Sequence, residues 1–428
     1  MKEEERFTPD FKAMIRIVIW NSLGFIFVEF IMIYVANQIL GASGTQVGLV
    51  FSLLTMGSLT SSFIVGYFTD RISKKFLIML GSFGRGISYF SFYVAVILKS
   101  LPGIYISCLL LGFGAGIFWV PFDTLISDKS SKYYRSSAFG QRRFAMGIGM
   151  IGGAIIGFLI FGITIVFFPE NSFIIYGAFP LFGIANFYAG IQFSRKVDEN
   201  RKFIQVKDKI NEVGNNEHNP FQNDRMKSII KKTFSSFIIG MILLFITLFL
   251  ANLNAGIYRP FIQPYILENI ESNPALVSWI YIPTTVIGTL FAPKLGNIAD
   301  KVNVYISITI ASILGGITTW LVIVSKDLWI FTFLLIIDNV IALFSSFVLI
   351  NFLSRISKKH RGKLIGSLTS FEQLGFSLGP ILGGYVWDLI GQSAPFLISI
   401  IVEWSLIPLF IIGFWILNPH VEESVNIS

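Results

Sequence analysis

The sequence is poor in the residues that build most metal centres and enzyme active sites. Its 428 residues include one cysteine and three histidines, and only 14% of them are charged. A single thiol, that of Cys108, forms no intrachain disulfide and no cysteine-based metal site. The histidines, His218, His360 and His420, lie in polar stretches or near the end of the chain. No nucleophile–base pair or set of metal ligands is found, so the sequence predicts no metal, no cofactor and no enzyme activity.

The sequence supports neither a serine hydrolase nor an ATP-driven pump. The stretch GFSLG at residues 375–379 matches the Gly-x-Ser-x-Gly pattern of serine hydrolases. That pattern requires a strand-to-helix turn and a histidine partner, whereas this stretch lies in an apolar run typical of a membrane helix. A phosphate-binding loop of the Gly-x-x-x-x-Gly-Lys-Ser/Thr type is absent from the sequence. ATP-driven pumping is therefore unsupported.

Apolar residues, in contrast, are abundant. They make up 54% of the chain and recur in runs long enough to cross a bilayer, which takes about 20 residues. Lipid offers no hydrogen-bond partners, so a spanning run satisfies its backbone by forming a helix. The sequence predicts an all-α, polytopic protein embedded in the lipid bilayer. Twelve transmembrane helices are expected, over residues 14–38, 46–68, 76–98, 103–126, 143–167, 172–194, 234–257, 274–297, 304–324, 328–352, 364–387 and 394–416.

The net charge of +8 follows this topology. If the amino terminus is cytoplasmic, lysine and arginine crowd into the cytoplasmic connections, and only Lys99, Arg259 and Lys326 fall on the other side. This bias predicts a multi-pass protein of the cell membrane with both termini in the cytoplasm. The basic charge is thus a topology signal and not a nucleic-acid patch. The charged opening MKEEERFTPD predicts no cleavable signal sequence.

The chain reads as two similar halves. A polar stretch at residues 195–232 separates six predicted helices from six. We expect it to be a flexible cytoplasmic linker, with a regulatory site as the alternative. The predicted units are therefore a first bundle at 1–194, the linker at 195–232 and a second bundle at 233–428.

Internal repetition supports this division. The glycine spacing of GQRRFAMGIGMIGGAIIGF, at 140–158, returns about half a chain later in GSLTSFEQLGFSLGPILGG, at 366–384. Likewise, GYFTDR at 66–71 returns as GNIADK at 296–301, each at the end of a predicted span. A duplicated six-helix unit explains both repeats, and duplicated halves facing a central site are typical of secondary transporters.

The loop after the second span resembles that of the major facilitator superfamily, which reads Gly-x-x-x-Asp-Arg-x-Gly-Arg/Lys-Arg/Lys. Ser73 stands here where the family usually has glycine, and the second copy lacks the final basic pair. The matching positions are Gly66, Asp70, Arg71, Lys74 and Lys75 in the first copy and Gly296, Asp300 and Lys301 in the second. The resemblance implies a twelve-helix transporter that works by alternating access. It also implies that Asp70 caps a helix of the other half and closes the cytoplasmic side; the alternative is a solvated charge cluster.

Two glycine stripes predict close helix packing. Glycines four residues apart share one face of a helix and let a neighbouring backbone approach. The predicted packing seam consists of Gly149, Gly153 and Gly157 in the fifth span and Gly375, Gly379, Pro380 and Gly383 in the eleventh. Such a seam either shifts during transport or serves static packing. In the resembled family the full pattern, in the fifth helix, is associated with antiporter-type exporters, whereas this fifth span has Ala154 and Phe158 at two of its positions.

Ionisable residues inside spans are the strongest indication of a substrate site. Each costs about 2.5–3.5 kcal/mol on insertion scales, so it usually faces a cavity or a partner. In the resembled family, the first, fourth, seventh and tenth helices line the central cavity. The predicted proton and substrate residues are Glu29, Asp123, Asn252, Arg259, Asp338 and Glu372.

These candidates have different expected roles. Glu29 is the first choice for a proton or cation site, with a structural hydrogen bond as the alternative, and Asp338 is the second. Glu372 shares a face with Gly379 and would point toward the seam. Asp123 either faces the cavity or pairs with Arg142 or Arg143, and Arg259 either binds an anion or marks the outer interface. Structural roles are expected for Glu403 and Arg85.

The predicted function is secondary transport of a small organic solute, driven by protons. A leaning toward efflux of amphipathic or cationic compounds follows from the acidic cavity and the glycine pattern. Two alternatives stay open: proton-coupled uptake of a sugar or organic acid, and a sensor that keeps the fold but does not transport. The protein is expected to be a monomer that binds no nucleic acid.

Overall fold

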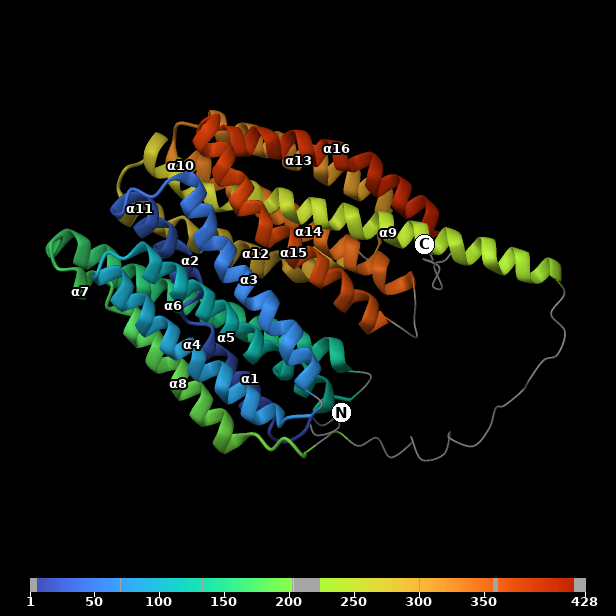
Figure 1. The fold of residues 1–428 in the computed structure, drawn as a ribbon, viewed down its shortest axis with the longest axis horizontal. Coiled ribbons are helices and arrows are strands. Elements are labelled where there is room, and N and C mark those ends of the chain that lie inside the picture. Colours follow the sequence, from blue (N-terminus) through green and yellow to red (C-terminus); the bar gives the residue numbers. More distant parts are fainter. Residues whose placement is uncertain are drawn as a thin grey trace.

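The computed structural model describes residues 6–69, 71–131, 134–201, 203, 224–299, 301–356 and 361–418, and helices dominate this part of the chain (Figure 1). The first half consists of α1 (Phe11–Asn21), α2 (Phe25–Tyr34), a π-helical turn (Val35–Ile39), α3 (Gly44–Phe68), α4 (Lys74–Ile97), α5 (Leu101–Asp128), α6 (Arg135–Phe167), α7 (Ser172–Ile175) and α8 (Ala178–Lys196). The second half consists of α9 (Asp224–Tyr258), a 3₁₀ turn (Arg259–Phe261), α10 (Ile262–Asn269), α11 (Pro274–Trp279), α12 (Tyr281–Ala299), α13 (Val304–Val324), α14 (Leu328–Ile356), α15 (Arg361–Leu389) and α16 (Ala394–Leu417).

Each predicted span has a helical counterpart among the described residues. Nine helical stretches of this part of the chain are long and apolar enough to cross a membrane. The predicted third, sixth and eleventh spans correspond to α4, α8 and α15, which contain more charged or polar residues. The all-α architecture follows from the need to satisfy every backbone group inside lipid.

Three spans differ from the simple rods that hydropathy predicts. The first is interrupted at residues 22–24, where Gly24 lies so close to the Tyr89 ring that a Cβ atom would overlap it. The seventh continues through the 3₁₀ turn into α10. Pro260 lies in this turn and has no backbone N–H, so regular α-helical hydrogen bonding is interrupted there. The eighth begins as the short α11 and bends at Ile280 before α12. Hydropathy measures length and not helix continuity, so it gives no sign of these breaks.

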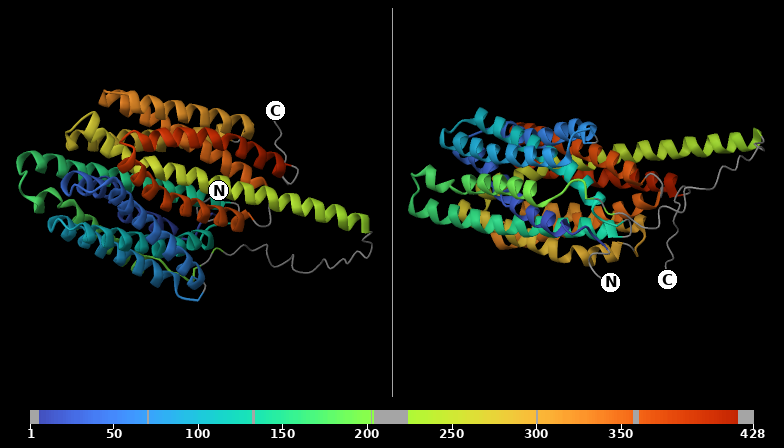
Figure 2. Two further views of the ribbon diagram at one scale, coloured as in Figure 1. Left: turned by 45° about the horizontal axis from the view of Figure 1, so that its top comes forward. Right: turned by 90° about the horizontal axis from the view of Figure 1, so that it is seen from below.

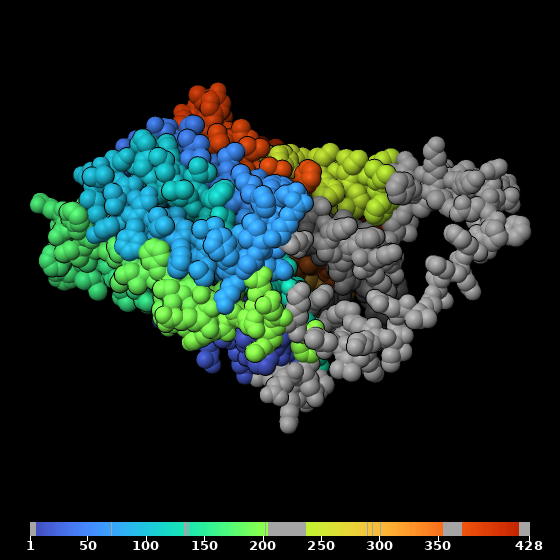
Figure 3. Space-filling view, turned by 60° about the horizontal axis from the view of Figure 1, so that its bottom comes forward, coloured from blue at the N-terminus to red at the C-terminus, as the bar shows by residue number. Residues whose placement is uncertain are grey.

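The two halves lie side by side in the ribbon views (Figure 2). In the space-filling view, the blue-to-green first half lies beside the yellow-green beginning of the second (Figure 3). At one end of the bundle, buried side chains of both halves form a single core; Phe30 and Phe161 of the first half belong to it together with Phe261, Tyr265 and Val277 of the second. We call this the shared-core end.

At the opposite end, each half has a hydrophobic core of its own. Phe11, Phe118 and Phe122 belong to the core of the first half. Phe352 and Phe414 belong to the core of the second. We call this the split-core end; α1 begins there and α16 ends there (Figure 1).

The glycine stripes pack in the same way in both halves. In the first half, the stripe of α6 lies against α1 and α2: an added Cβ atom at Gly149 or Gly153 would overlap the carbonyl oxygen of Ile19 or Leu23. A Cβ atom at Gly157 would overlap the Phe27 ring.

In the second half, the stripe of α15 lies against α9. Added Cβ atoms at Gly375, Gly379 and Gly383 would overlap the carbonyl oxygens of successive turns of α9, those of Phe249, Leu253 and Ile257. The fifth span therefore packs on the first as the eleventh packs on the seventh, which is the pairing that a duplicated unit predicts.

Candidate functional site

A cavity of about 250 Å³ lies at the boundary between the halves. The first half contributes Ile26, Glu29 and Ile33 from α2 and Met150 from α6. The second half supplies the remaining wall: Ala255, Tyr258, Arg259, Ile262, Ile280, Tyr281, Thr284, Thr285, Leu335, Asp338, Asn339 and Ala342. We call it the central cavity.

Charges of both signs meet in the central cavity. Glu29 enters from the middle of α2, Asp338 from α14, and Arg259 from the turn that follows α9. Tyr258 and Asp338 both line this cavity, and the Arg259 guanidinium lies 6.0 Å from the centre of the Phe376 ring. The cavity therefore offers sites for a cation and for an anion beside apolar surface.

A second cavity, of about 340 Å³, lies inside the second half. Its walls come from α9, α13, α14, α15 and α16, and we call it the lateral chamber. It shares Ala255, Tyr258, Asp338 and Ala342 with the central cavity. Its other lining residues are Leu248, Ala251, Asn252, Asn254, Ile308, Ser312, Gly315, Ile341, Ser345, Ser346, Leu349, Glu372, Glu403, Leu406 and Phe410.

The structure distributes the predicted cavity residues over three places. Glu29 and Arg259 line the central cavity, Asn252 and Glu372 line the lateral chamber, and Asp338 lines both.

Asp123, on α5, lines neither cavity. Its Oδ1 atom lies 3.0 Å from Nε of Arg142, whose guanidinium lies 4.4 Å from the centre of the Trp119 ring. The structure thus shows the ion pair that the sequence offered as the alternative for Asp123.

Glu403 is the chamber residue that sequence reasoning missed. A structural role was expected for this residue of the twelfth span. In the structure Glu403 faces α13: a Cβ atom added at Gly315 would lie 2.7 Å from its Oε1 atom. The signal in the sequence was the acid itself, because an ionisable group inside a span is costly wherever it lies.

Arg85 takes the structural position that was expected for it. Its side chain is completely buried, donates a hydrogen bond to Oδ1 of Asn21, and lies 4.5 Å from the centre of the Phe25 ring. Asn21 in turn donates to Ser82 at 3.2 Å and to Asn186 at 3.0 Å. These contacts join α1, α4 and α8 next to the break in the first span.

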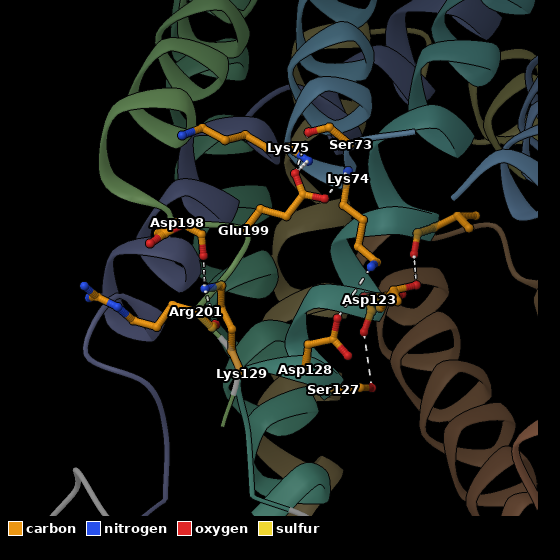
Figure 4. A network of polar contacts seen from close by, with 12 residues as sticks. Ser73, Lys74, Lys75, Asp123, Ser127, Asp128, Lys129, Asp198, Glu199 and Arg201 are labelled. Carbon is orange, nitrogen blue, oxygen red and sulfur yellow. Dashed lines mark hydrogen bonds and ion pairs between the residues drawn. The ribbon is translucent and has the colours of Figure 1, made fainter. Parts of the chain in front are cut away.

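Some described residues of the predicted gate loop form hydrogen bonds with the chain that follows α8. Ser73 donates to Glu199, and the backbone N–H groups of Lys74 and Lys75 donate to its Oε1 and Oε2 at 2.7 and 3.2 Å (Figure 4). Lys74 also approaches Asp128, at 3.6 Å. The chain that follows α8 is therefore held against the start of α4.

The remaining gate positions make few contacts or lie outside the described residues. Arg71 lies over the Tyr67 ring, 4.2 Å from its centre. A Cβ atom added at Gly66 or Gly296 would meet no atom within 4 Å. Lys301 is exposed. Asp70 and Asp300 lie outside the described residues, so the cap predicted for Asp70 stays a prediction.

A buried ammonium group ties three further segments of the first half together. Nζ of Lys129, at the end of α5, is completely buried and lies 2.7 Å from Oδ2 of Asp10. It also donates to the carbonyl oxygens of Asp198 at 2.6 Å and Arg201 at 3.1 Å. Burial acts to raise the pKa of Asp10, but the hydrogen bonds from Lys129, Thr8 and the backbone of Asp198 outweigh it and lower that pKa.

At the shared-core end, a carboxylate of one half caps a helix of the other. Asp388, near the end of α15, accepts hydrogen bonds from the backbone N–H of Gly44 at 2.6 Å and of Thr45 at 2.8 Å, and from the Thr45 hydroxyl at 2.7 Å. These are the first residues of α3, so the carboxylate accepts from N–H groups that have no partner within the helix. Its negative charge also interacts favourably with the positive end of the helix dipole.

The helix backbones touch beside this cap. A Cβ atom at Gly48 would overlap the carbonyl oxygen of Pro380, and one at Gly384 would overlap that of Gly44. A carboxylate-to-helix contact between the halves was expected from Asp70. The structure has a contact of this kind from Asp388, at the opposite end of the bundle.

Comparison with known proteins agrees with this architecture. The model of the Major Facilitator Superfamily matches residues 13–246 and 244–427. Similar proteins include the uncharacterized MFS-type transporter YqjV of Bacillus subtilis, 24% identical over 90% of this chain and 88% of that protein. The multidrug resistance protein MdtG of Yersinia enterocolitica is 25% identical over 87% of this chain and 85% of that protein.

Among solved structures, a bacterial homolog of the human lysosomal transporter Spinster, in an inward-facing and unoccupied conformation, superposes with a TM-score of 0.68. It is 12% identical, and the superposition covers 98% of this chain and 97% of that one. At this identity the likeness concerns the fold. The family model, which matches both halves, shows that the chain belongs to the major facilitator superfamily of secondary transporters.

Proposed function

We propose that this transporter exports amphipathic or cationic compounds in exchange for protons. The observation that supports this most is the position of Glu29 and Asp338 in one cavity at the boundary of the halves. Acids inside membrane proteins that line a cavity often mark substrate paths and proton relays, because placing them in a span is costly. The multidrug function in the name of the Yersinia relative supports the same substrate class.

Alternating access follows from the two kinds of core. At the shared-core end the halves are joined by Asp388 and by contacts between the α3 and α15 backbones. At the split-core end each half packs separately, so the halves can rock about the shared core. If the termini are cytoplasmic, the structure is closed toward the outside.

Proteoliposomes test the proposal. Purified protein should move a lipophilic fluorescent cation only when a pH gradient is imposed, and Glu29→Gln or Asp338→Asn should lower the initial rate by about tenfold or more, as expected for loss of a positioned proton site. Glu170→Gln, at an exposed position, is the matched control and should transport normally.

The outcomes separate the alternatives. Transport that ignores the pH gradient, with Glu29→Gln fully active, would contradict proton coupling. Gradient-driven accumulation of sugars or organic acids but not of cations would favour uptake. Ligand binding without any transport would favour a sensor.

A further inference from the structure

Among the residues that the structure describes, the lateral chamber is lined by the second half alone. Its walls come from α9, α13, α14, α15 and α16. Glu372 and Glu403 line this chamber and not the central cavity, whereas Glu29 lines the central cavity and not the chamber. The two spaces therefore have separate acids, which substitutions can distinguish.

The chamber has charge of one sign. Asp338, Glu372 and Glu403 enter it from three different helices, and none of the described residues that line it is basic. Arg259 belongs to the lining of the central cavity, beyond Tyr258 and Asp338. Asp338 shares the central cavity with Arg259, but no basic residue joins Glu372 and Glu403 in the described lining of the chamber. These two carboxylates therefore favour a cationic guest, because negative charge in a low-dielectric site is stabilised by an opposite charge.

A buried amide supplies a second and independent indication of a guest. Asn254 lines the chamber and is only 5% exposed. Its Nδ2 donates to the carbonyl oxygen of Ser399 at 3.1 Å, while its Oδ1 is buried and has no hydrogen-bond partner. An unsatisfied buried acceptor costs about 1–3 kcal/mol. A guest that brings an N–H donor would satisfy it.

The size and walls of the chamber indicate the kind of cation. Among the described residues, no group of three or more acids, histidines or cysteines is placed to hold a metal ion. The volume of about 340 Å³ exceeds that of a bare inorganic ion, and Leu248, Ile308, Leu406 and Phe410 add apolar surface. This combination fits an organic molecule with an ammonium head and an apolar body.

We propose that the lateral chamber is a binding site for a primary organic ammonium ion, separate from the central cavity. The N–H groups of the bound ammonium donate to the Glu403 carboxylate and to Oδ1 of Asn254, and its apolar body packs on the leucine, isoleucine and phenylalanine side chains. Glu372 adds negative charge to the wall of the same chamber. Asp338 and Tyr258 form the wall that this site shares with the central cavity. The proposal concerns binding and holds whether or not transport is coupled to protons.

Equilibrium binding to the purified full chain tests it with phenethylammonium as the probe. Phenethylammonium should bind, whereas 2-phenylethanol, which lacks the charge, and benzyltrimethylammonium, which lacks N–H donors, should bind at least about tenfold more weakly. Glu403→Gln should weaken phenethylammonium by about tenfold, because removing a desolvated charge contact costs at least that factor. Glu372→Gln, which removes negative charge from the chamber wall, should weaken it by a smaller factor. Glu170→Gln is the control for a change of charge far from the site.

Gly315→Ala tests the geometry without removing a charge. Its Cβ atom would lie 2.7 Å from Oε1 of Glu403, so the carboxylate must move, and we expect affinity to fall by about threefold or more while the protein stays folded. This variant keeps the proposal testable if a glutamine variant fails to fold.

Two results would overturn the proposal. Weakening by Glu29→Gln, with Glu372→Gln and Glu403→Gln binding normally, would place the cation in the central cavity. Binding of sodium that competes with phenethylammonium, with equal affinity for the trimethylated probe, would show an unspecific acidic surface in place of a built site.

Discussion

Single carboxylates hold the helix ends of this transporter in place. Glu199 accepts from the first N–H groups of α4 within the first half. Asp388 does the same for α3, but from the other half. Both use free backbone donors that every helix offers at its start. The two contacts differ in consequence, because only the second must break when the halves separate at the shared-core end.

The cap at Glu199 predicts acid sensitivity. Burial acts to raise the pKa of Glu199, but the hydrogen bonds from Ser73 and from the backbone of Lys74 and Lys75, with the nearby Lys74 charge, outweigh it and lower that pKa. A lowered pKa in the folded state means that the stabilisation is complete above the ordinary value of 4.5 and is lost as the pH falls below it.

Glu199→Gln should therefore lower the thermal midpoint at pH 7 by the equivalent of about 0.5–1 kcal/mol, the range for a solvated cap. The difference from the unmodified protein should shrink at pH 4, because below 4.5 the unfolded state takes up a proton at Glu199 more readily than the folded state does. Thermal unfolding in detergent at both pH values measures this, with Glu170→Gln as the control. A difference that grows in acid would contradict the assignment.

The cap at Asp388 predicts control of the outer opening. Asp388→Ala leaves the N–H groups of Gly44 and Thr45 without their partner, at a cost of about 1 kcal/mol to the closed arrangement. The population opened at the shared-core end should rise several-fold. Thr45→Val, which removes one of the three bonds, should have a smaller effect.

A cysteine at Thr284, in the central cavity, provides the measurement. Its labelling by an impermeant thiol reagent, added at the shared-core face, should speed up several-fold in Asp388→Ala. The native Cys108 is buried and contributes little background. An unchanged rate would show that Asp388 does not hold the halves together.

At the level of elements, the glycine stripes determine which helices touch. α6 packs on the broken first span, and α15 packs on α9, in each case with a backbone carbonyl where a side chain would otherwise lie. Contact at this range is what small residues provide in a membrane, where packing and not the hydrophobic effect drives association. Gly48 and Gly384 allow the same close backbone contact between α3 of the first half and α15 of the second.

A pair of alanine substitutions on α6 tests the stripe. Gly153→Ala would overlap the carbonyl oxygen and Cα of Leu23, so we expect a loss of about 1–3 kcal/mol, the usual cost of overpacking. Gly152→Ala is the matched control, because no atom lies within 4 Å of its added Cβ. The thermal midpoint in detergent should fall for the first and stay level or rise for the second. Equal midpoints would mean that the stripe does not pack as described.

At the scale of the whole molecule, the two ends of the bundle predict opposite membrane faces. Lys326, between α13 and α14, lies at the shared-core end, and Lys196, at the end of α8, lies at the split-core end. Both residues are exposed. With cytoplasmic termini, a cysteine at 326 should be labelled by an impermeant thiol reagent in intact cells. A cysteine at 196 should be labelled only after permeabilisation, and the reverse pattern would invert the topology.

Much of this fold could be predicted from local patterns in the sequence. The long apolar runs indicate all-α spans, because a backbone in lipid has no other way to satisfy its hydrogen bonds. The spacing of Gly149, Gly153 and Gly157 identifies a packing face, because four residues return a helix to the same side. The helix breaks at Gly24 and Ile280 were not predicted, because local composition does not show which side chains of neighbouring helices pack against these positions.

The candidate site was predicted residue by residue but not as an arrangement. The sequence by itself determined that Glu29, Asp338 and Glu372 lie inside spans, because hydropathy depends only on neighbours along the chain. Only the tertiary structure decided that Glu403 joins Asp338 in a chamber, that Asp123 pairs with Arg142, and that Asp388 reaches α3. The physical reason is that these contacts depend on the rotation and depth of helices far apart in the chain, which packing determines.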